Sequence, residues 1–477
     1  MKKKNKAIYL LFLMPFVYFA TACFVVWLVK TSGIYPSGSD TMYHVYRGDY
    51  VYNAIKSGNW YPLYDPAWYN GVEILRYWSP FPAYVMAFCQ YLAGGSQFGA
   101  YLFYIGGVCF LGACVWPFIG RGFNRPYMGA FIGLLWFFMP NNLCAIFIEG
   151  NLARSLSMIF LPVFIYSVYK YLYNHKLRYI PLMVFTFLLM ELCHLGYAGM
   201  VAIAVIIYGI VYMIQKGRKK AVLDVVISMI FGFMLLGIWL VASLKGGITS
   251  LDNSENMANF FQNLWITINP FERLTRGFEY FYFGFAALVV IVFGILFGYK
   301  KSRTGFVTGF IILLMTTKSA YAVLKHLPGS QYLWMLRFIS IALCMILMSF
   351  LMWDRLKKTL VLMLCVLLVV DTIPSLSLIV GEHNDISVQE RMVARQDSTL
   401  ISSAQAVTKQ RLALMDESIL VYNQPRQTSG KRIVDIGSRT LRQIFCRDGS
   451  NRTDHRFFTL FGITYHNHFL QGFRIFL

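Results

Sequence analysis

The chain has 477 residues, of which 57% are hydrophobic and only 14% are charged, and its mean hydropathy is +0.54. Soluble domains carry about a quarter charged residues, so this composition excludes a disordered chain, a collagen, a coiled coil and a small disulfide scaffold, and it disfavours a soluble enzyme. The net charge of +21 comes from Lys and Arg clusters between apolar blocks, a distribution typical of a polytopic membrane protein rather than of a nucleic-acid-binding protein.

The first apolar block, residues 7–29, follows a basic segment at residues 1–6, which we place in the cytoplasm. The block is too long for the core of a signal peptide, so we expect an uncleaved spanning helix. A polar and aromatic loop follows, and the block at 80–92 is too short to span, because a span needs about 20 residues. We expect eleven spanning helices, over residues 7–29, 98–119, 127–139, 156–173, 180–195, 197–214, 221–243, 280–297, 305–316, 333–352 and 360–373.

The distribution of positive charge supports this count. If residues 80–92 do not span, every compact basic cluster falls on one side, as the positive-inside rule requires. We therefore predict an all-α polytopic protein of the bacterial plasma membrane, with a cytoplasmic N-terminus and an extracellular C-terminus. Residues 1–376 form the transmembrane domain, with a large first extracellular loop at 31–96. Residues 377–477 form a small extracellular segment, mixed or β-rich; the chain ends on apolar residues, and truncation is one explanation.

Three residues of the first loop have helical spacing. Asp40, His44 and Arg47 lie at positions i, i+4 and i+7, so on a helix they share one face. The carboxylate can act as a general base or bind a metal, and Arg47 can hold an anion through two hydrogen bonds. A capped helix with an internal ion pair is the structural alternative. The aromatic residues around Arg76 suit either a membrane-interface belt or a surface on which sugars stack.

Further polar residues lie at the predicted outer ends of the helices. Glu149 and Arg154 either pair with each other or face the same cavity as Asp40. His194, at the end of the fifth expected helix, is either a packing residue or part of a site. Arg337 lies in an apolar block and needs a partner; lipid phosphate or pyrophosphate is a natural one, and snorkelling to headgroups is the alternative.

These stretches together resemble a known group of bacterial membrane proteins. The first loop resembles that of the 6-pyruvoyl-tetrahydropterin synthase-related family, whose members look like GT-C-type glycosyltransferases. Residues 149–154, 191–194 and 331–338 fit the same pattern, with Cys193 where the family usually has Thr. The resemblance covers about residues 1–375 and carries the first-loop motif of Asp40, His44, Arg47, Gly58, Tyr61, Pro62, Gly71 and residues 77–81.

The resemblance implies a GT-C-like fold and an inverting transfer of sugar at the outer membrane face. The donor would be a polyprenyl-phosphate-linked sugar, and the acceptor a glycan, a lipid or a protein. Asp40 matches the family's acidic residue, which serves as base or metal ligand, and His44 would orient Asp40 or bind substrate. The remaining candidates would bind substrate: Arg47, Arg76, Glu149, Arg154, His194 and Arg337.

Cofactors and competing functions complete the prediction. We expect Mg²⁺ or Mn²⁺ as the metal, with Asp40 as its ligand. No P-loop or dinucleotide fingerprint occurs in the sequence, so we expect no nucleotide cofactor, and we expect no nucleic-acid partner. Two alternatives are a transporter or flippase of lipid-linked sugars and a non-catalytic envelope-assembly protein. The first of these would place polar residues through the middle of the helix bundle.

Overall fold

The structure is a computed structural model, and it describes residues 2–32, 35, 38, 40–65, 72–245, 264–269, 282–327, 330, 333–353 and 357–380. Chain contacts divide the protein into two compact units, residues 1–61 with 75–383 and residues 62–74 with 384–477. The described part of the second unit contains an antiparallel β-bridge between Asp65 and Val72, with two N–H···O distances of 2.9 Å. The predicted outer segment at 377–477 lies outside the described residues, apart from helix α19 (Ser377–Val380).

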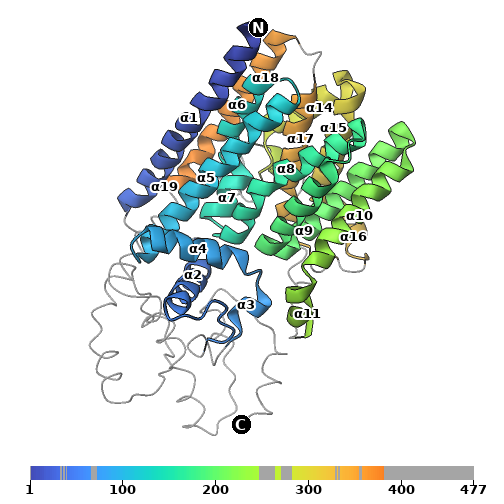
Figure 1. The fold of residues 1–477 in the computed structure, drawn as a ribbon. Coiled ribbons are helices and arrows are strands. Elements are labelled where there is room, and N and C mark those ends of the chain that lie inside the picture. Colours follow the sequence, from blue (N-terminus) through green and yellow to red (C-terminus); the bar gives the residue numbers. More distant parts are fainter. Residues whose placement is uncertain are drawn as a thin grey trace, which may run out of the picture. The chain divides into compact units, whose positions relative to one another are not determined.

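The described residues of the first unit form a helical bundle, so the predicted all-α class is confirmed for them (Figure 1). Helix α1 (Lys2–Ser32) packs along α5 (Gln97–Gly122) and α6 (Pro126–Trp136). Tyr18 Oη joins α1 to α6 by donating to the backbone oxygen of Ala130 at 2.9 Å. Because α1 is apolar and mostly exposed, it lies at the edge of the bundle, where lipid would contact it.

Three shorter helices belong to the first loop and lie together at one end of the bundle (Figure 1). They are α2 (Thr41–Lys56), α3 (Ile74–Tyr77) and α4 (Phe81–Leu92), and α2 packs on α4. Helix α4 has 12 residues, so at 1.5 Å per residue it is about 18 Å long, too short for a span of about 30 Å. The expected short helix at 80–92 is therefore confirmed as a helix.

A further helix lies between the expected helices at 127–139 and 156–173. Helix α7 (Pro140–Phe147) follows α6 after a break, with an angle of 41° between the two. Pro140 takes the first position of α7, where its missing N–H leaves no hydrogen bond unmade. Every residue of α7 is buried, so its apolar side chains pack inside the bundle rather than facing water. The predicted end of the helix at 127–139 is therefore followed by a buried helix, and its placement on the outer side remains a prediction.

Helices α8 (Leu152–Asn174) and α9 (Tyr179–Lys216) form the middle of the bundle. The 38 residues of α9 would be about 57 Å long if straight, but the helix breaks at His194, whose φ and ψ are −156° and 94°. The first and the last turns of α9 both lie beside the C-terminal part of α8. At that end the Tyr179 ring lies 6.0 Å from that of Tyr166, and Tyr212 Oη donates to Leu172 O at 2.6 Å. The predicted turn at 195–196 thus lies one residue from the break.

The remaining helices surround a fully buried one. Helix α17 (Phe338–Met352), preceded by the 3₁₀ turn η5 (Met335–Arg337), contacts α8, α9, α14 and α15. Of its apolar window 94% is buried, against 28% for α18, so α17 is the centre and α18 the periphery. The other elements are α10 (Lys219–Leu235), α11 (Gly237–Lys245), α12 (Leu264–Ile268), α14 (Phe285–Phe297), α15 (Lys300–Met315), α16 (Lys318–Leu324), α18 (Lys358–Thr372) and η6 (Ile373–Leu376).

Within the described residues, six helices are long and apolar enough to cross a membrane, or up to eight if each bent pair counts as one span. The second bent pair is α10 with α11, which meet at 66°. Helix α14 is apolar but has only 13 residues. The predicted count of eleven spans remains a prediction.

Basic residues gather at one end of this bundle. Arg218 contacts His175, Lys170 donates to Gly122 O, and Tyr173 Oη donates to the backbone oxygen of Lys301 at 3.1 Å. These contacts bring together the C-terminal ends of α5 and α8 and the starts of α10 and α15. The N-terminal end of α8 lies about 34 Å away along the 23-residue helix.

Candidate functional site

The start of α2 is tied to the turn before α8. The backbone N–H of Asp40 donates to Glu149 O at 2.9 Å, and that of Thr41 donates to Gly38 O at 3.1 Å. Two glycines allow this approach: a Cβ on Gly38 would lie 2.7 Å from the Cα of Gly150. Gly150 has a φ of +62°, a backbone conformation that favours glycine. The first loop therefore begins against the Glu149–Gly150 turn.

This contact places the three predicted residues of the first loop near the N-terminal end of α8. Asp40 directly precedes α2, and its charge acts on Arg337. His44, one turn later, is partly buried and close enough to Arg47 and His194 for their charges to act on it. Burial, together with those two neighbours, holds the pKa of His44 well below its usual value. His44 is therefore neutral at pH 7.

Arg47 is 8% exposed, and its guanidinium carbon lies 3.8 Å from the centre of the Trp78 ring. This is a close cation–π contact. Trp78 is itself 40% exposed, so the stack extends from the buried side of α2 to the surface. The sequence pattern predicted an anion-binding role for Arg47, and the stacking is compatible with that role.

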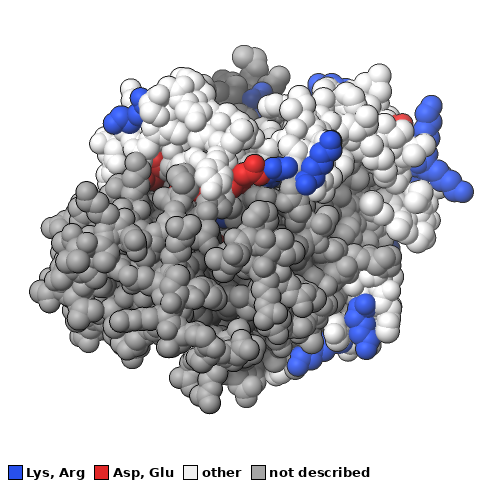
Figure 2. All heavy atoms as spheres, turned by 90° about the horizontal axis from the view of Figure 1, so that it is seen from below, with Lys and Arg blue, Asp and Glu red and all other residues white. Residues whose placement is uncertain are grey.

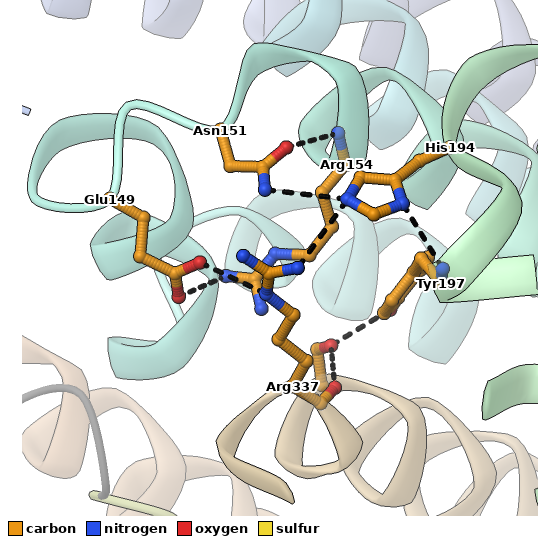
Figure 3. A network of polar contacts seen from close by, with 7 residues as sticks. Glu149, Asn151, Arg154, His194, Tyr197 and Arg337 are labelled. Atoms are coloured by element: carbon orange, nitrogen blue, oxygen red, sulfur yellow. Dashed lines mark hydrogen bonds and ion pairs between the residues drawn. The ribbon is translucent and has the colours of Figure 1, made fainter. Parts of the chain in front are cut away.

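The beginning of α8 holds a buried ion pair. Asn151 is the N-cap, and its Oδ1 accepts the backbone N–H of Arg154 at 2.9 Å, which satisfies one of the free N–H groups of the first turn. Arg154 is fully buried, and its Nη2 lies 2.8 Å from Glu149 Oε1 (Figure 3). Of the two predicted readings for Glu149 and Arg154, pairing with each other is confirmed.

Arg337 and His194 complete the group. Arg337 Nε lies 3.4 Å from Glu149 Oε2, so one carboxylate faces two guanidinium groups (Figure 3). His194 Nδ1 accepts the backbone N–H of Tyr197 at 3.1 Å, and its Nε2 lies 3.4 Å from Asn151 Nδ2 and 3.5 Å from Arg337 Nη1. The partner of Arg337 within the described residues is a protein carboxylate, whereas the sequence suggested lipid phosphate or pyrophosphate.

Five residues on four elements thus form what we call the Glu149 cluster: Glu149, Asn151, Arg154, His194 and Arg337. Two arginines and one glutamate leave these five residues with one surplus positive charge, and the Asp40 carboxylate outside the cluster also acts on Arg337. A second contact supports the backbone around it, because Ser340 Oγ donates to Arg337 O at 3.0 Å and is hydrogen-bonded to Tyr197 Oη at 2.8 Å. A surplus of buried positive charge is unfavourable alone and favours an anionic ligand.

Arg76 is directed to another part of the bundle. Its Nε donates to Ala242 O at 2.9 Å, and Ser243 Oγ donates to Arg76 O. Trp239 Nε1 donates to Leu75 O at 2.7 Å, so the described contacts of this segment fasten α3 to α11. Within the contacts that the structure describes, Arg76 does not join the Glu149 cluster, and its predicted binding role remains a prediction.

Glu191 is a buried acidic residue near the cluster. It lies one turn before His194, is 1% exposed, and its Oε2 has no hydrogen-bond partner among the described residues. Ser79 Oγ donates to its backbone oxygen at 2.9 Å, which ties α9 to the start of α4. Ionisable side chains inside membrane proteins are costly and are often functional.

Sequence reasoning missed Asn151 and Tyr197. The signal for Asn151 was present, because an Asn directly before an apolar helical run is a typical N-cap. No local signal marks Tyr197 as a donor to His194, since that contact depends on the break in α9.

The described residues do not form a metal site made of protein ligands alone. No group of three His, Cys, Asp or Glu side chains in the described part of the chain is placed to hold an ion. The Glu149 carboxylate already faces two arginines. Mg²⁺ commonly binds through one or two carboxylates together with substrate phosphates, so Asp40 as a metal ligand remains a prediction, and we derive no chemical step through a metal.

The end of the first unit near α2 and α3 is seen in Figure 2. On the described part, Lys and Arg side chains lie at separate points rather than in one continuous patch (Figure 2). Glu149 is 8% exposed and Arg154 is fully buried. The charge of the cluster therefore lies inside the protein, where interactions with a ligand are less weakened by water.

The chain was compared with known proteins. No curated protein matches it. Residues 75–379, more than half of the chain, match a family described as 6-pyruvoyl-tetrahydropterin synthase related domain, membrane protein. The matched region includes all five residues of the Glu149 cluster. The chain therefore belongs to the 6-pyruvoyl-tetrahydropterin synthase-related family of membrane proteins.

Proposed function

We propose that this protein is a membrane glycosyltransferase with a GT-C-like fold, which moves a sugar from a polyprenyl-phosphate carrier to a glycan, lipid or protein acceptor. The observation that carries the proposal is the position of Asp40. Its backbone is held at 2.9 Å from Glu149 O, which keeps a partly buried carboxylate beside a cluster with surplus positive charge. A base next to an anion site is what transfer from a phosphate leaving group requires.

In the proposed reaction Asp40 accepts the proton of the acceptor hydroxyl. The acceptor oxygen forms a bond to the anomeric carbon of the sugar while the bond from that carbon to the phosphate oxygen breaks. The electron pair of the breaking bond stays on the phosphate, and attack from the opposite face inverts the anomeric centre. Arg337 and Arg154 stabilise the charge that develops on the departing phosphate, an effect worth several kcal/mol, roughly 3 for a single donor.

Two other residues of α2 have supporting roles in this proposal. His44 is neutral at pH 7, so it can orient Asp40 or a substrate hydroxyl by a hydrogen bond without adding positive charge. Arg47, whose guanidinium carbon lies 3.8 Å from the centre of the Trp78 ring, would contact a sugar or phosphate oxygen. The polyprenyl chain would lie in the lipid beside the apolar helices, and the reaction needs no nucleotide.

The test is sugar transfer by membranes that carry the wild-type chain or Asp40→Asn. Radiolabelled polyprenyl-phosphate hexoses are supplied with and without Mg²⁺ or Mn²⁺, and the label is followed into product. Asp224→Asn is the matched control, because Asp224 lies at the opposite end of the bundle and accepts a hydrogen bond from Tyr171 Oη. Loss of transfer in Asp40→Asn alone supports the proposal, and equal transfer by both variants removes Asp40 from the chemistry.

Two further outcomes concern the metal and the alternatives. Loss of transfer with a chelator, restored by Mg²⁺ or Mn²⁺, supports Asp40 as a metal ligand. Movement of the labelled carrier across the membrane without sugar transfer favours a transporter or flippase instead. A wild-type chain that neither transfers nor moves the carrier favours an envelope-assembly role.

A further inference from the structure

Three side-chain nitrogens of the Glu149 cluster, on His194, Asn151 and Arg337, face one another rather than acceptors. His194 Nδ1 accepts the backbone N–H of Tyr197 at 3.1 Å, so in the neutral ring the proton is on Nε2. That Nε2 lies 3.4 Å from Asn151 Nδ2 and 3.5 Å from Arg337 Nη1. A guanidinium nitrogen has only N–H bonds to offer, and both distances exceed those of ordinary hydrogen bonds.

The orientation of the Asn151 amide is settled by a second contact. Its Oδ1 accepts the backbone N–H of Arg154 at 2.9 Å, and exchanging oxygen and nitrogen would set two donors against each other there. Asn151 is 4% exposed, so its Nδ2 has little access to water. His194 Nε2, Asn151 Nδ2 and Arg337 Nη1 are therefore three N–H donors directed at one region (Figure 3). Among the described residues, no oxygen accepts from any of the three.

The neighbouring arginine strengthens this pattern. Arg154 is fully buried, and its Nε and Nη1 have no hydrogen-bond partner in the described part of the chain. A buried donor without an acceptor costs about 1–3 kcal/mol, and more when it is charged. An ordinary structural network would place an acceptor here, as it does between Ser340 and Tyr197. Here the described acceptor is the Glu149 carboxylate, whose Oε1 accepts from Arg154 Nη2 at 2.8 Å.

We infer that His194, Asn151 and Arg337 together bind one phosphoryl oxygen of an anionic ligand, with His194 acting as a donor and not as a base. Combined with the proposed function, on which this part of the inference rests, the oxygen belongs to the phosphate of the polyprenyl carrier. An acceptor-only, negatively charged oxygen is the group that three converging donors and a surplus positive charge fit. Asn151 thereby becomes a ligand-binding residue as well as a helix cap.

The substitution Asn151→Asp tests the site with little change to the fold. Asp is as good an N-cap as Asn, so the bond to the Arg154 N–H persists. The amide donor becomes a carboxylate oxygen that faces Arg337 and His194 and repels a phosphate. We expect the variant to be at least as stable as the wild type without ligand, because the new carboxylate supplies the missing acceptor.

Binding is measured on the full purified chain in detergent, by thermal stabilisation with farnesyl phosphate, inorganic phosphate and farnesol. We expect farnesyl phosphate to stabilise the wild type, farnesol to have no effect, and Asn151→Asp to raise the Kd for farnesyl phosphate by at least about tenfold. Arg337→Lys keeps the charge but loses the directed N–H and should weaken binding in the same direction.

The remaining outcomes separate this inference from the proposed function. Equal affinity for inorganic phosphate and farnesyl phosphate, lost in Asn151→Asp, supports the phosphoryl site but removes the polyprenyl carrier. Phosphate binding that depends on Asn151, in a protein that transfers no sugar, supports the site while the glycosyltransferase proposal fails. Unchanged binding in Asn151→Asp, or no preference of the wild type for either phosphate over farnesol, overturns the inference.

Discussion

The substitution Glu149→Gln removes the negative charge on which the cluster depends. Glu149 Oε1 lies 2.8 Å from Nη2 of Arg154, whose side chain is fully buried, and Oε2 lies 3.4 Å from Nε of Arg337. Removing one partner of a buried ion pair costs roughly 3–5 kcal/mol, because the remaining charge is left without compensation. Gln keeps one acceptor oxygen for Arg154, so we expect a loss of about 3 kcal/mol in the free energy of unfolding.

The same change has the opposite effect on ligand binding. A carboxylate about 5 Å from a bound anion repels it by roughly 3 kcal/mol at an effective dielectric constant of about 20. Glu149→Gln removes this repulsion and leaves two arginines without their shared carboxylate. A phosphate-bearing ligand should therefore stabilise the variant more than it stabilises the wild type, although the variant is less stable alone.

Unfolding is followed by tryptophan fluorescence in mixed micelles with increasing SDS, with and without farnesyl phosphate. Asp224→Asn is the control, because it also changes a carboxylate into an amide, but its described side-chain partner is the neutral Tyr171 hydroxyl at 2.5 Å. We expect the control to lose less than about 1 kcal/mol. If Glu149→Gln unfolds like the control, the ion pairs do not hold the cluster together and the reasoning fails.

Three further predictions concern neighbouring residues. In the unfolded chain His44 takes up a proton near pH 6.5, whereas the folded protein resists that protonation. The free energy of unfolding should therefore fall by up to about 1.4 kcal/mol per pH unit below that value. His44→Asn should flatten this slope in thermal unfolding across pH 4–8, and an unchanged slope would show that other groups cause it. Glu191→Gln should leave unfolding stability unchanged or raise it by up to about 2 kcal/mol, because the buried Oε2 has no hydrogen-bond partner among the described residues; a marked loss in the SDS titration would reveal a cationic partner. Gly150→Ala should lower the free energy of unfolding by about 1–3 kcal/mol and weaken farnesyl phosphate binding. The new Cβ would overlap Thr41 Oγ1 and lie 2.5 Å from Thr41 N, at a backbone φ of +62°. Normal stability and affinity would show that the contact between α2 and the Glu149–Gly150 turn is dispensable.

The sequence alone determined the class of the protein and most of its helices. Long apolar runs cannot be buried in a small soluble core, so their lengths predict spanning helices, and α5, α8 and α17 lie close to the predicted blocks. The shared face of Asp40, His44 and Arg47 depended on a helix there, and α2 contains His44 and Arg47 while Asp40 directly precedes it. The break between the arms of α9 was predicted one residue away, because Gly196 in an apolar run was read as a turn.

Local sequence was less informative where apolar segments change direction. We expected the helix at 127–139 to end near residues 140–142, and the chain there continues into the buried helix α7. Pro suits the first turn of a helix as well as a loop. The choice between the two depended on whether other helices would cover the segment, and a local pattern does not contain that information.

Only the tertiary structure decided which charged groups meet. Arg337 lies 188 positions after Glu149 and 143 after His194, and packing of α17 against α8 and α9 brings the three together. From the sequence, lipid phosphate or pyrophosphate was a natural partner for Arg337, with snorkelling to headgroups as the alternative. Opposite charges attract wherever they come close. The packing of whole helices through their apolar faces decides which charges come close. The break at His194 and the cap at Asn151 then direct N–H groups toward one region, a geometry that residue identities alone do not specify.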